Sequence, residues 1–219
     1  MLKTLSPERV DACLAEAAGS PMAADGVEYP TWYLHRWHFL PEGYLSRRSS
    51  AMYDAVVRRV YNVASEARLH AALVAALMRQ GAEDILELGS GPGNGLLAMH
   101  TALPSTKVTG IDLSPFLLEM AHDRLPERAA ELVHGDATRL PWSDGAFDAV
   151  VSQHVLGHLP PAAALTAWNE ASRVLRPGGR LYLLEHAWHK RRPGPLRPAL
   201  KQPLLAGLIR LEAFEKAEA

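Results

Sequence analysis

The sequence predicts an α/β protein in which a mostly parallel sheet lies between two layers of helices. Five short apolar segments alternate with segments of helical pattern, which is typical of parallel strands joined by crossover helices. A glycine-rich turn directly after the first of these strands supports the same fold class. The expected strands are residues 84–88, 107–111, 131–134, 147–152 and 180–185, and the helices between them are 95–103, 115–125 and 161–175.

Length and composition are those of one globular α/β domain. The 219 residues are 48% hydrophobic and 21% charged, and the net charge is −1. A near-neutral chain is not typical of a nucleic-acid-binding protein, so we expect no nucleic acid among its partners. Cys13 is the single cysteine, and no stretch has the length and apolarity of a signal peptide core or a membrane span. We therefore expect no transmembrane segment and a cytoplasmic location.

The first 80 residues are predicted to form a helical and aromatic-rich lid or cap. Ser6 and Pro7 are a typical helix start, and further helices are expected over residues 51–61 and 65–80. Between them, the segment 29–44 is rich in tyrosine and tryptophan and is interrupted by prolines. This aromatic segment has two interpretations, a lid over an apolar acceptor or a cluster that tethers the N-terminal part to the core.

The strongest local signal is the run ILELGSGPGNG at residues 85–95. A buried strand ends near Glu87, and alternating glycines then allow the backbone to turn sharply and approach a ligand. Asn94 opens the next helix, whose free N–H groups can bind an anion. Such a turn also occurs in NAD-dependent enzymes, and it can be merely structural.

Asp112 ends the second predicted strand, 19 residues after Gly93. An acid at about this distance can accept hydrogen bonds from ribose hydroxyls. An N-cap for the next helix is the alternative, but Ser114 before Pro115 fits that role better.

Two further segments follow the third and fourth strands. Asp136 is placed to accept from the exocyclic amine of an adenine, and Gln153 and His154 come at the carboxyl end of the fourth strand. Open α/β sheets bind ligands at this edge. The run LRPGG at 175–179 then supplies a helix stop and a turn into the fifth strand.

Together, these four motifs resemble the class I S-adenosylmethionine (AdoMet)-dependent methyltransferases, especially the branch of the ubiquinone/menaquinone-biosynthesis C-methyltransferases. The resemblance covers about residues 52–185 and implies a Rossmann-like three-layer sandwich with AdoMet as cofactor. The implied cofactor site comprises Glu87, Gly89, Ser90, Gly91 and Asn94 near the methionine end, Asp112 at the ribose, Leu113, Asp136 and Ala137 around adenine, and Gln153 near the sulfonium.

The resemblance implies methyl transfer to a small-molecule acceptor, in which the cofactor supplies the electrophile and the protein mainly aligns the acceptor. A base is needed only if the acceptor must lose a proton, and His154 and His158, four residues apart, are the candidates. An apolar, quinone-like or lipid-like acceptor is a hypothesis by analogy. No metal site is expected. A non-catalytic AdoMet-binding subunit and an NAD-dependent oxidoreductase remain the alternatives.

The C-terminal part departs from the pattern of the family, whose sheet usually ends in an antiparallel pair of strands. Residues 187–219 contain prolines and then an apolar run of helical composition, so we expect a C-terminal helical segment after a core at 81–186, and no strand pair. A sheet ending at residue 185 would expose an open edge, so we also expect association, as a homodimer or with a partner protein.

Overall fold

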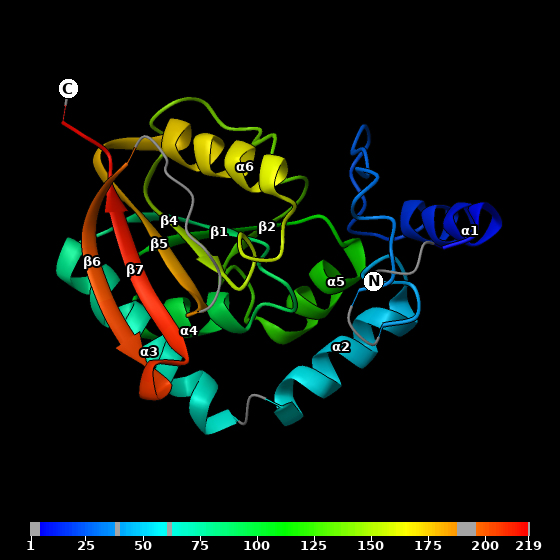
Figure 1. Cartoon of the computed structure of the whole chain (residues 1–219), viewed down its shortest axis with the longest axis horizontal. Coiled ribbons are helices and arrows are strands. Elements are labelled where there is room, and N and C mark those ends of the chain that lie inside the picture. Colours follow the sequence, from blue (N-terminus) through cyan, green and yellow to red (C-terminus); the bar gives the residue numbers. More distant parts are fainter. Residues whose placement is uncertain (1–4, 38–39, 61–62, 188–195, 219) are drawn as a thin grey trace.

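The computed structural model describes residues 5–37, 40–60, 63–187 and 196–218. It is built around a seven-stranded sheet in the order β3-β2-β1-β4-β5-β7-β6 (Figure 1). Neighbouring strands from β1 to β5 pair in parallel, whereas β7 is antiparallel to β5 and β6. The strands are β1 (Asp84–Leu88), β2 (Lys107–Asp112), β3 (Glu131–His134), β4 (Phe147–Gln153), β5 (Leu175–His186), β6 (Arg197–Leu204) and β7 (Ile209–Glu215).

Helices cover both faces of the sheet, which confirms the three-layer prediction. Alternate residues of β1 point to opposite faces: Ile85 packs with α3 and α4, whereas Leu86 packs with α6. Figure 1 shows α6 on one side of the sheet and α3 and α4 on the other. The helices are α1 (Pro7–Ala18), α2 (Arg47–Val60), α3 (Val63–Gln80), α4 (Asn94–Ala102), α5 (Pro115–Arg124) and α6 (Pro161–Val174).

The strand order reverses between β2 and β4, which flank β1. In open α/β sheets, a crevice forms at the carboxyl ends of the strands at such a reversal. The ends of β1, β2 and β4, with the loop after β3, are therefore the part of the fold expected to bind a ligand. The Ser114 hydroxyl accepts from the Leu117 N–H (3.3 Å) and caps α5, as the sequence predicted.

The prediction that the C-terminal strand pair is missing was wrong. β6 and β7 form a hairpin that completes the sheet, joined by a 3-10 turn (Leu205–Gly207). The prolines that suggested a break, Pro198 and Pro203, lie in the edge strand β6, where a missing N–H breaks no pairing with a further strand. The predicted C-terminal helix is likewise wrong for residues 197–215.

The apolar residues of that segment belong to the core and not to an unpartnered helix. Leu211 of β7 packs on the α3 side of the sheet, and Phe214 packs on the other side, where its ring meets Trp168 of α6 (4.8 Å between ring centroids). Arg180 of β5 pairs in register with Glu215 of β7 and forms an ion pair with it (2.6 Å). The open edge from which we expected association is therefore filled by the chain's own strands, and association stays a prediction without that support.

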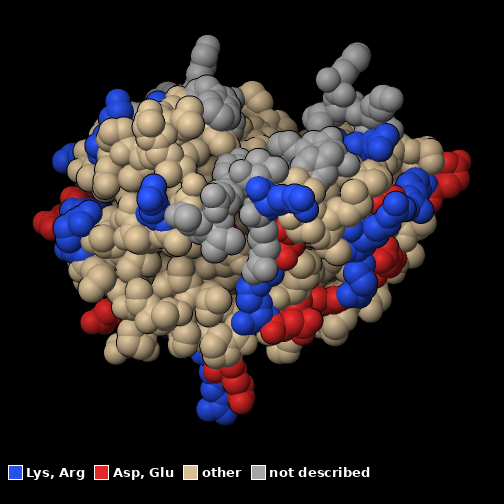
Figure 2. All heavy atoms as spheres, turned by 90° about the horizontal axis from the view of Figure 1, so that it is seen from below, with Lys and Arg blue, Asp and Glu red and all other residues tan. Residues whose placement is uncertain are grey.

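The predicted boundary at residue 80 separates segments that pack together. Leu73 and Leu77 of α3 are fully buried in the same cluster as Ile85 of β1, so α3 is a layer of the core. None of the described helices is both long and apolar enough to cross a membrane. On the face seen in Figure 2, positive and negative side chains are interspersed among uncharged residues.

Candidate functional site

Two adjoining hollows open at the carboxyl ends of β1, β2 and β4 and form one cleft. Their volumes, including the open mouths, are about 850 and 1230 Å³, which is sufficient for a cofactor and a small second ligand. Gly89, Gly91 and Gln153 line both hollows, so the two are continuous. The twelve side chains or backbone positions singled out from the sequence all line this cleft: Glu87, Gly89, Ser90, Gly91, Asn94, Asp112, Leu113, Asp136, Ala137, Gln153, His154 and His158.

The glycine-rich turn between β1 and α4 forms the floor of the cleft. Gly89 has a φ of +62°, and a Cβ there would lie 2.5 Å from a methyl group of Val155. A Cβ on Gly95 would collide with the Glu87 carboxylate and the Gln153 amide. Glycine at these two positions is therefore required for β1, α4 and the end of β4 to approach so closely.

Asp112 fixes the turn from the neighbouring strand. One of its carboxylate oxygens accepts from the Gly91 N–H and the other from the Ser114 N–H, both at 2.8 Å. The side chain is buried, and burial raises its pKa to about 6, although the N–H groups of Ser114, Gly91 and Leu113 counteract this rise. Each oxygen keeps a further lone pair for a ligand donor.

Glu87 is a buried carboxylate with one oxygen engaged. Its Oε1 accepts from the Gln153 amide (2.6 Å), while Oε2 has no hydrogen-bond partner among the described residues. The side chain is 2% exposed. Burial raises its pKa to about 8, the Gln153 hydrogen bond opposes this, and the charge of Asp112 adds to it. An unpaired buried carboxylate oxygen is costly, so it favours a cationic or donating ligand group.

The loop after β3 closes one end of the cleft. Asp136 accepts from the Thr138 N–H (2.7 Å) and lines the cleft beside Ala137 and Leu113. The four carboxylates that line the cleft are those of Glu66, Glu87, Asp112 and Asp136, and the described lining residues include no lysine or arginine. The lining therefore favours a ligand with positive charge.

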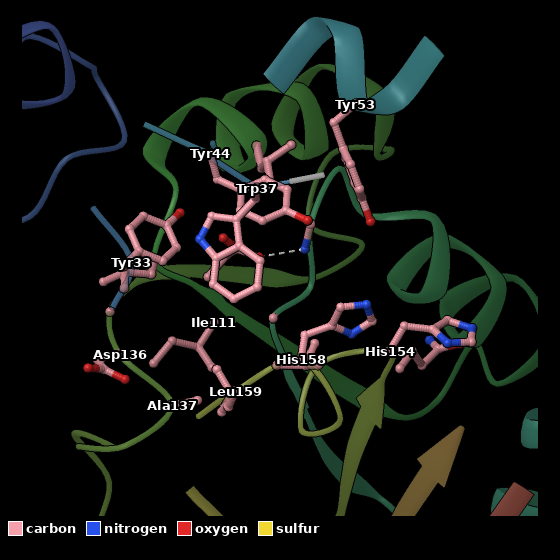
Figure 3. A pocket seen from close by; sticks show the side chains of 18 of the residues that line it. Tyr33, Trp37, Tyr44, Tyr53, Ile111, Asp136, Ala137, His154, His158 and Leu159 are labelled. Atoms are coloured by element: carbon pink, nitrogen blue, oxygen red, sulfur yellow. Dashed lines mark hydrogen bonds between the residues drawn. The ribbon is translucent and has the colours of Figure 1, made fainter. Parts of the chain in front are cut away.

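The opposite end contains the two histidines that follow β4. His154 has a left-handed backbone (φ +55°), its N–H donates to the Leu184 carbonyl (2.9 Å), and its ring lies 5.0 Å from that of His186. His158 lies in a turn that is closed by a hydrogen bond from its own N–H to the Val155 carbonyl (2.9 Å). Both histidines line the cleft, as Figure 3 shows.

Asn94 is engaged in a network that joins several helices. Its amide donates to Glu66 of α3 (2.8 Å) and its carbonyl accepts from Arg124 of α5 (2.5 Å). Arg124 also donates to the Pro92 carbonyl (2.7 Å) and pairs with Asp54 of α2 (3.0 Å). The Asn94 side chain therefore fixes the helices around the glycine-rich turn, and its backbone N–H remains the better candidate for a ligand contact.

The N-terminal aromatic residues form the wall that faces the strand ends. Aromatic rings of Trp37, Tyr44 and Tyr53 stand over the cleft in Figure 3. They are joined in series, with ring centroids 6.4 Å apart between Trp37 and Tyr44 and 5.2 Å apart between Tyr44 and Tyr53. The composition of the segment predicted an aromatic cover, but not which rings would enter the cleft. Tyr53 lies on α2, outside the aromatic segment, in the run MYDAVVRRVYN that resembles the Tyr-Asp segment preceding the core in this branch.

The same segment is also tethered to the core, which agrees with the second interpretation, while its role as a lid over an acceptor stays a prediction. His134, at the end of β3, accepts from the Ala24 N–H (3.0 Å) and contacts the Tyr29 hydroxyl and the Leu113 carbonyl (both 3.2 Å). Because Nδ1 accepts, the proton of the neutral ring is on Nε2. The Ser114 hydroxyl donates to the Tyr44 carbonyl (2.9 Å).

The described residues contain no group of three or more His, Cys, Asp or Glu side chains arranged to hold a metal ion.

Comparisons with known proteins agree with this geometry. Residues 86–183 match the family model described as "Methyltransferase domain". A ubiquinone/menaquinone biosynthesis C-methyltransferase of Desulfotalea psychrophila is 33% identical over 140 residues, covering 61% of this chain and 56% of that protein. A demethylmenaquinone methyltransferase of Staphylococcus aureus is 37% identical over 119 residues, covering 53% and 46%. The matched part thus spans about half the length of these curated relatives.

Among solved structures, a Burkholderia thailandensis 1,6-didemethyltoxoflavin-N1-methyltransferase shares the fold, with a TM-score of 0.58 and 20% identity, covering 78% of this chain and 87% of that one. Fold, cleft and the match over residues 86–183 point to one class, and they support a class I AdoMet-dependent methyltransferase. The resemblance drawn from the four motifs is thereby confirmed. The two curated relatives named above act in ubiquinone or menaquinone biosynthesis by name, and the chain is similar to that branch.

Proposed function

We propose that this chain binds AdoMet in the cleft and transfers its methyl group to a small apolar acceptor. The observation that carries the proposal is the pair of buried carboxylates on either side of the glycine-rich turn. Glu87 presents an oxygen without a partner among the described residues, and Asp112 holds the turn while keeping lone pairs for further donors. A ligand with a cationic end and a ribose fits both.

The lining of the cleft fits the other parts of AdoMet. Glu87 would pair with the amino group of the methionine end, and Asp112 would accept from the ribose hydroxyls. Leu113 and Ala137 offer an apolar surface for adenine, and Asp136 an acceptor for its amine. The excess of carboxylates suits the positive charge of the sulfonium cofactor.

When bound, AdoMet supplies an electrophilic methyl group, so the protein is required to orient the acceptor, exclude water and take up any proton that the acceptor loses. Trp37, Tyr44 and Tyr53 would hold a flat or apolar acceptor and cover it. His154 and His158 are the candidates to take a proton from an acidic acceptor. His154 is the better placed, because its strained backbone is held in position by Leu184.

A quinone-like or lipid-like acceptor is supported by the aromatic wall and by the branch in which the chain falls. The acceptor atom is a separate matter, since carbon, nitrogen, oxygen and sulfur nucleophiles all fit an aromatic pocket with a neighbouring histidine.

Cys13 is buried and forms no disulfide. This suits a reducing compartment, and we place the protein in the cytoplasm.

Two other functions compete with this proposal. An NAD-dependent oxidoreductase shares the glycine-rich turn and the acid after the second strand, but the family match argues against it. A non-catalytic AdoMet-binding subunit would be favoured by an incomplete sheet, but β6 and β7 complete the sheet.

Turnover separates the enzyme from the binding subunit. Purified protein with methyl-labelled AdoMet should label an acceptor from a panel of quinols, phenols, heteroaromatic amines and unsaturated lipids. The His154→Ala variant should label the same acceptor with a lower kcat but an unchanged Kd for S-adenosylhomocysteine. If the wild-type protein binds AdoMet and labels no acceptor in the panel or in a metabolite extract, the binding-subunit function is favoured.

A further inference from the structure

Tyr33 lines the cleft and carries a buried hydroxyl group that the residues around it do not use. The residue lies in the N-terminal aromatic segment, is 7% exposed and lines the same hollow as Asp112 and Leu113. Its hydroxyl is buried and has no hydrogen-bond partner among the described residues. Buried tyrosine hydroxyls usually have a partner, so this one indicates a ligand.

The ring of Tyr33 is packed so that the hydroxyl cannot turn away to water. Tyr29 stacks on it with ring centroids 5.9 Å apart, Trp32 meets it edge-on at 5.9 Å, and Tyr44 lies 6.2 Å away on another side. These rings, with Leu113, form one apolar cluster. The position of the hydroxyl is therefore set by the fold before any ligand arrives.

The hydroxyl is a proton donor at every physiological pH. Burial raises the pKa of Tyr33 well above its ordinary value, and the carboxylate of Asp112 raises it further. The Ser114 hydroxyl has a small opposite effect, but it donates its proton to the Tyr44 carbonyl, and the Tyr33 hydroxyl has no hydrogen-bond partner among the described residues. Tyr33 thus presents an O–H close to Asp112 with no acceptor among the described groups.

The location of Tyr33 selects the part of the ligand that it meets. In Figure 3, Tyr33 and Asp136 lie at one end of the pocket, and His154 and His158 lie at the other. The first end is where Asp112, Leu113 and Asp136 suit the ribose and adenine. Adenosine carries acceptors there, in the ribose oxygens and the ring nitrogens, that Asp112 and Asp136 cannot satisfy because carboxylates only accept.

We propose that the Tyr33 hydroxyl is a cofactor-binding group that donates a hydrogen bond to the adenosine part of AdoMet. This inference rests on the proposed function and extends it. The N-terminal segment would then complete the cofactor site as well as cover the acceptor, and cofactor binding would satisfy a polar group that the free protein leaves buried and unpaired.

Tyr33→Phe tests this inference, because it removes only the hydroxyl. The free variant should melt at the same temperature as the wild type or higher, since no hydrogen bond within the protein is lost. Its Kd for S-adenosylhomocysteine should rise about five- to tenfold, the effect of one lost hydrogen bond. A role in packing alone would not weaken binding while leaving the melting temperature intact.

Tyr182→Phe is the matched control. Tyr182 is also buried, but its hydroxyl donates to the Gln80 side chain (3.0 Å) and the Ala76 carbonyl (3.3 Å), and it does not line the cleft. This control should lower the melting temperature by about 2–4 °C and leave the Kd unchanged. If Tyr33→Phe behaves in the same way as Tyr182→Phe, its hydroxyl has a partner in the protein and the inference is wrong.

A second ligand locates the contact. The Kd of 5′-methylthioadenosine, which has the adenosine but not the amino acid, should rise by the same factor in Tyr33→Phe. Loss of affinity for S-adenosylhomocysteine alone would place the contact at the methionine end and overturn the assignment, as would a Kd within twofold of wild type for both ligands. Failure of the wild-type protein to bind either ligand would instead refute the proposed function.

Discussion

Binding of S-adenosylhomocysteine should release a proton from Glu87 at neutral pH. The free protein holds this carboxyl group 2% exposed, with one oxygen on Gln153 and the other without a partner among the described residues. Burial raises its pKa to about 8, so the group is protonated at pH 7. The amino group of the ligand is cationic and pairs with the ionised form, so binding should expel the proton.

The size of the effect follows from the raised pKa. With a pKa of about 8, roughly nine-tenths of the free protein is protonated at Glu87 at pH 7, so about one proton should be released per ligand bound. Affinity should then improve about tenfold for each pH unit between about 6 and 8, and level off above 8. Asp112, with a pKa of about 6, should steepen the dependence below pH 6.

Titration calorimetry at pH 7 in two buffers that differ in ionisation enthalpy measures the released protons directly. The observed enthalpy should differ between the buffers by about one ionisation enthalpy for the wild type. Glu87→Gln keeps the shape and the Gln153 contact without the titrating proton, so its enthalpy should not depend on the buffer. Equal enthalpies for the wild type, together with equal affinities at pH 6 and pH 8, would refute this reasoning.

Three further outcomes are expected. Asp112→Ala should weaken S-adenosylhomocysteine binding by about 2–4 kcal/mol while the protein stays folded, and unchanged calorimetric affinity would remove Asp112 from the site. The pKa of Glu87 in the free protein lies above its ordinary 4.5, so the stability that this group contributes is complete below pH 4.5 and is lost as the pH rises through 8. Denaturant titration should therefore show that the free energy of unfolding falls by about 2 kcal/mol from pH 6 to pH 8, and by less in Glu87→Gln. Ending the chain at residue 195 removes β6 and β7 with the buried Leu211 and Phe214, so the product should lose its cooperative thermal transition, and a folded monomer with wild-type melting would contradict the packing of the hairpin.

Most of the parallel part of the sheet was predictable because β1, β2 and β4 are buried on both faces and therefore read as short apolar runs. The first and third strands were predicted at 84–88 and 131–134, the bounds they have in the structure. The hairpin at the C-terminus carried no such signal. Its edge strand contains Pro198 and Pro203, and its turn, Leu205–Gly207, lacks the Asn-Gly or Asp-Gly pair that announces most hairpins.

The strand-end residues of the candidate site were predictable because the parallel topology brings the ends of β1, β2 and β4 to one edge. Asp112 and Glu87 lie in the cleft for that reason. What sequence order does not reveal is which distant segments meet there. Tyr33 and Tyr53 enter the cleft from the N-terminal part through tertiary packing, and Asn94 is held by Arg124 of another helix.

The claim that this cleft is an AdoMet site is tested most directly by calorimetric titration of the intact protein with AdoMet, and with NAD, the cofactor of the alternative function, as the comparison. AdoMet should bind with one site per chain, and Asp112→Ala should abolish or greatly weaken that binding, while NAD gives no heat of binding. Binding of NAD in preference to AdoMet, or AdoMet binding that Asp112→Ala leaves intact, would contradict the assignment.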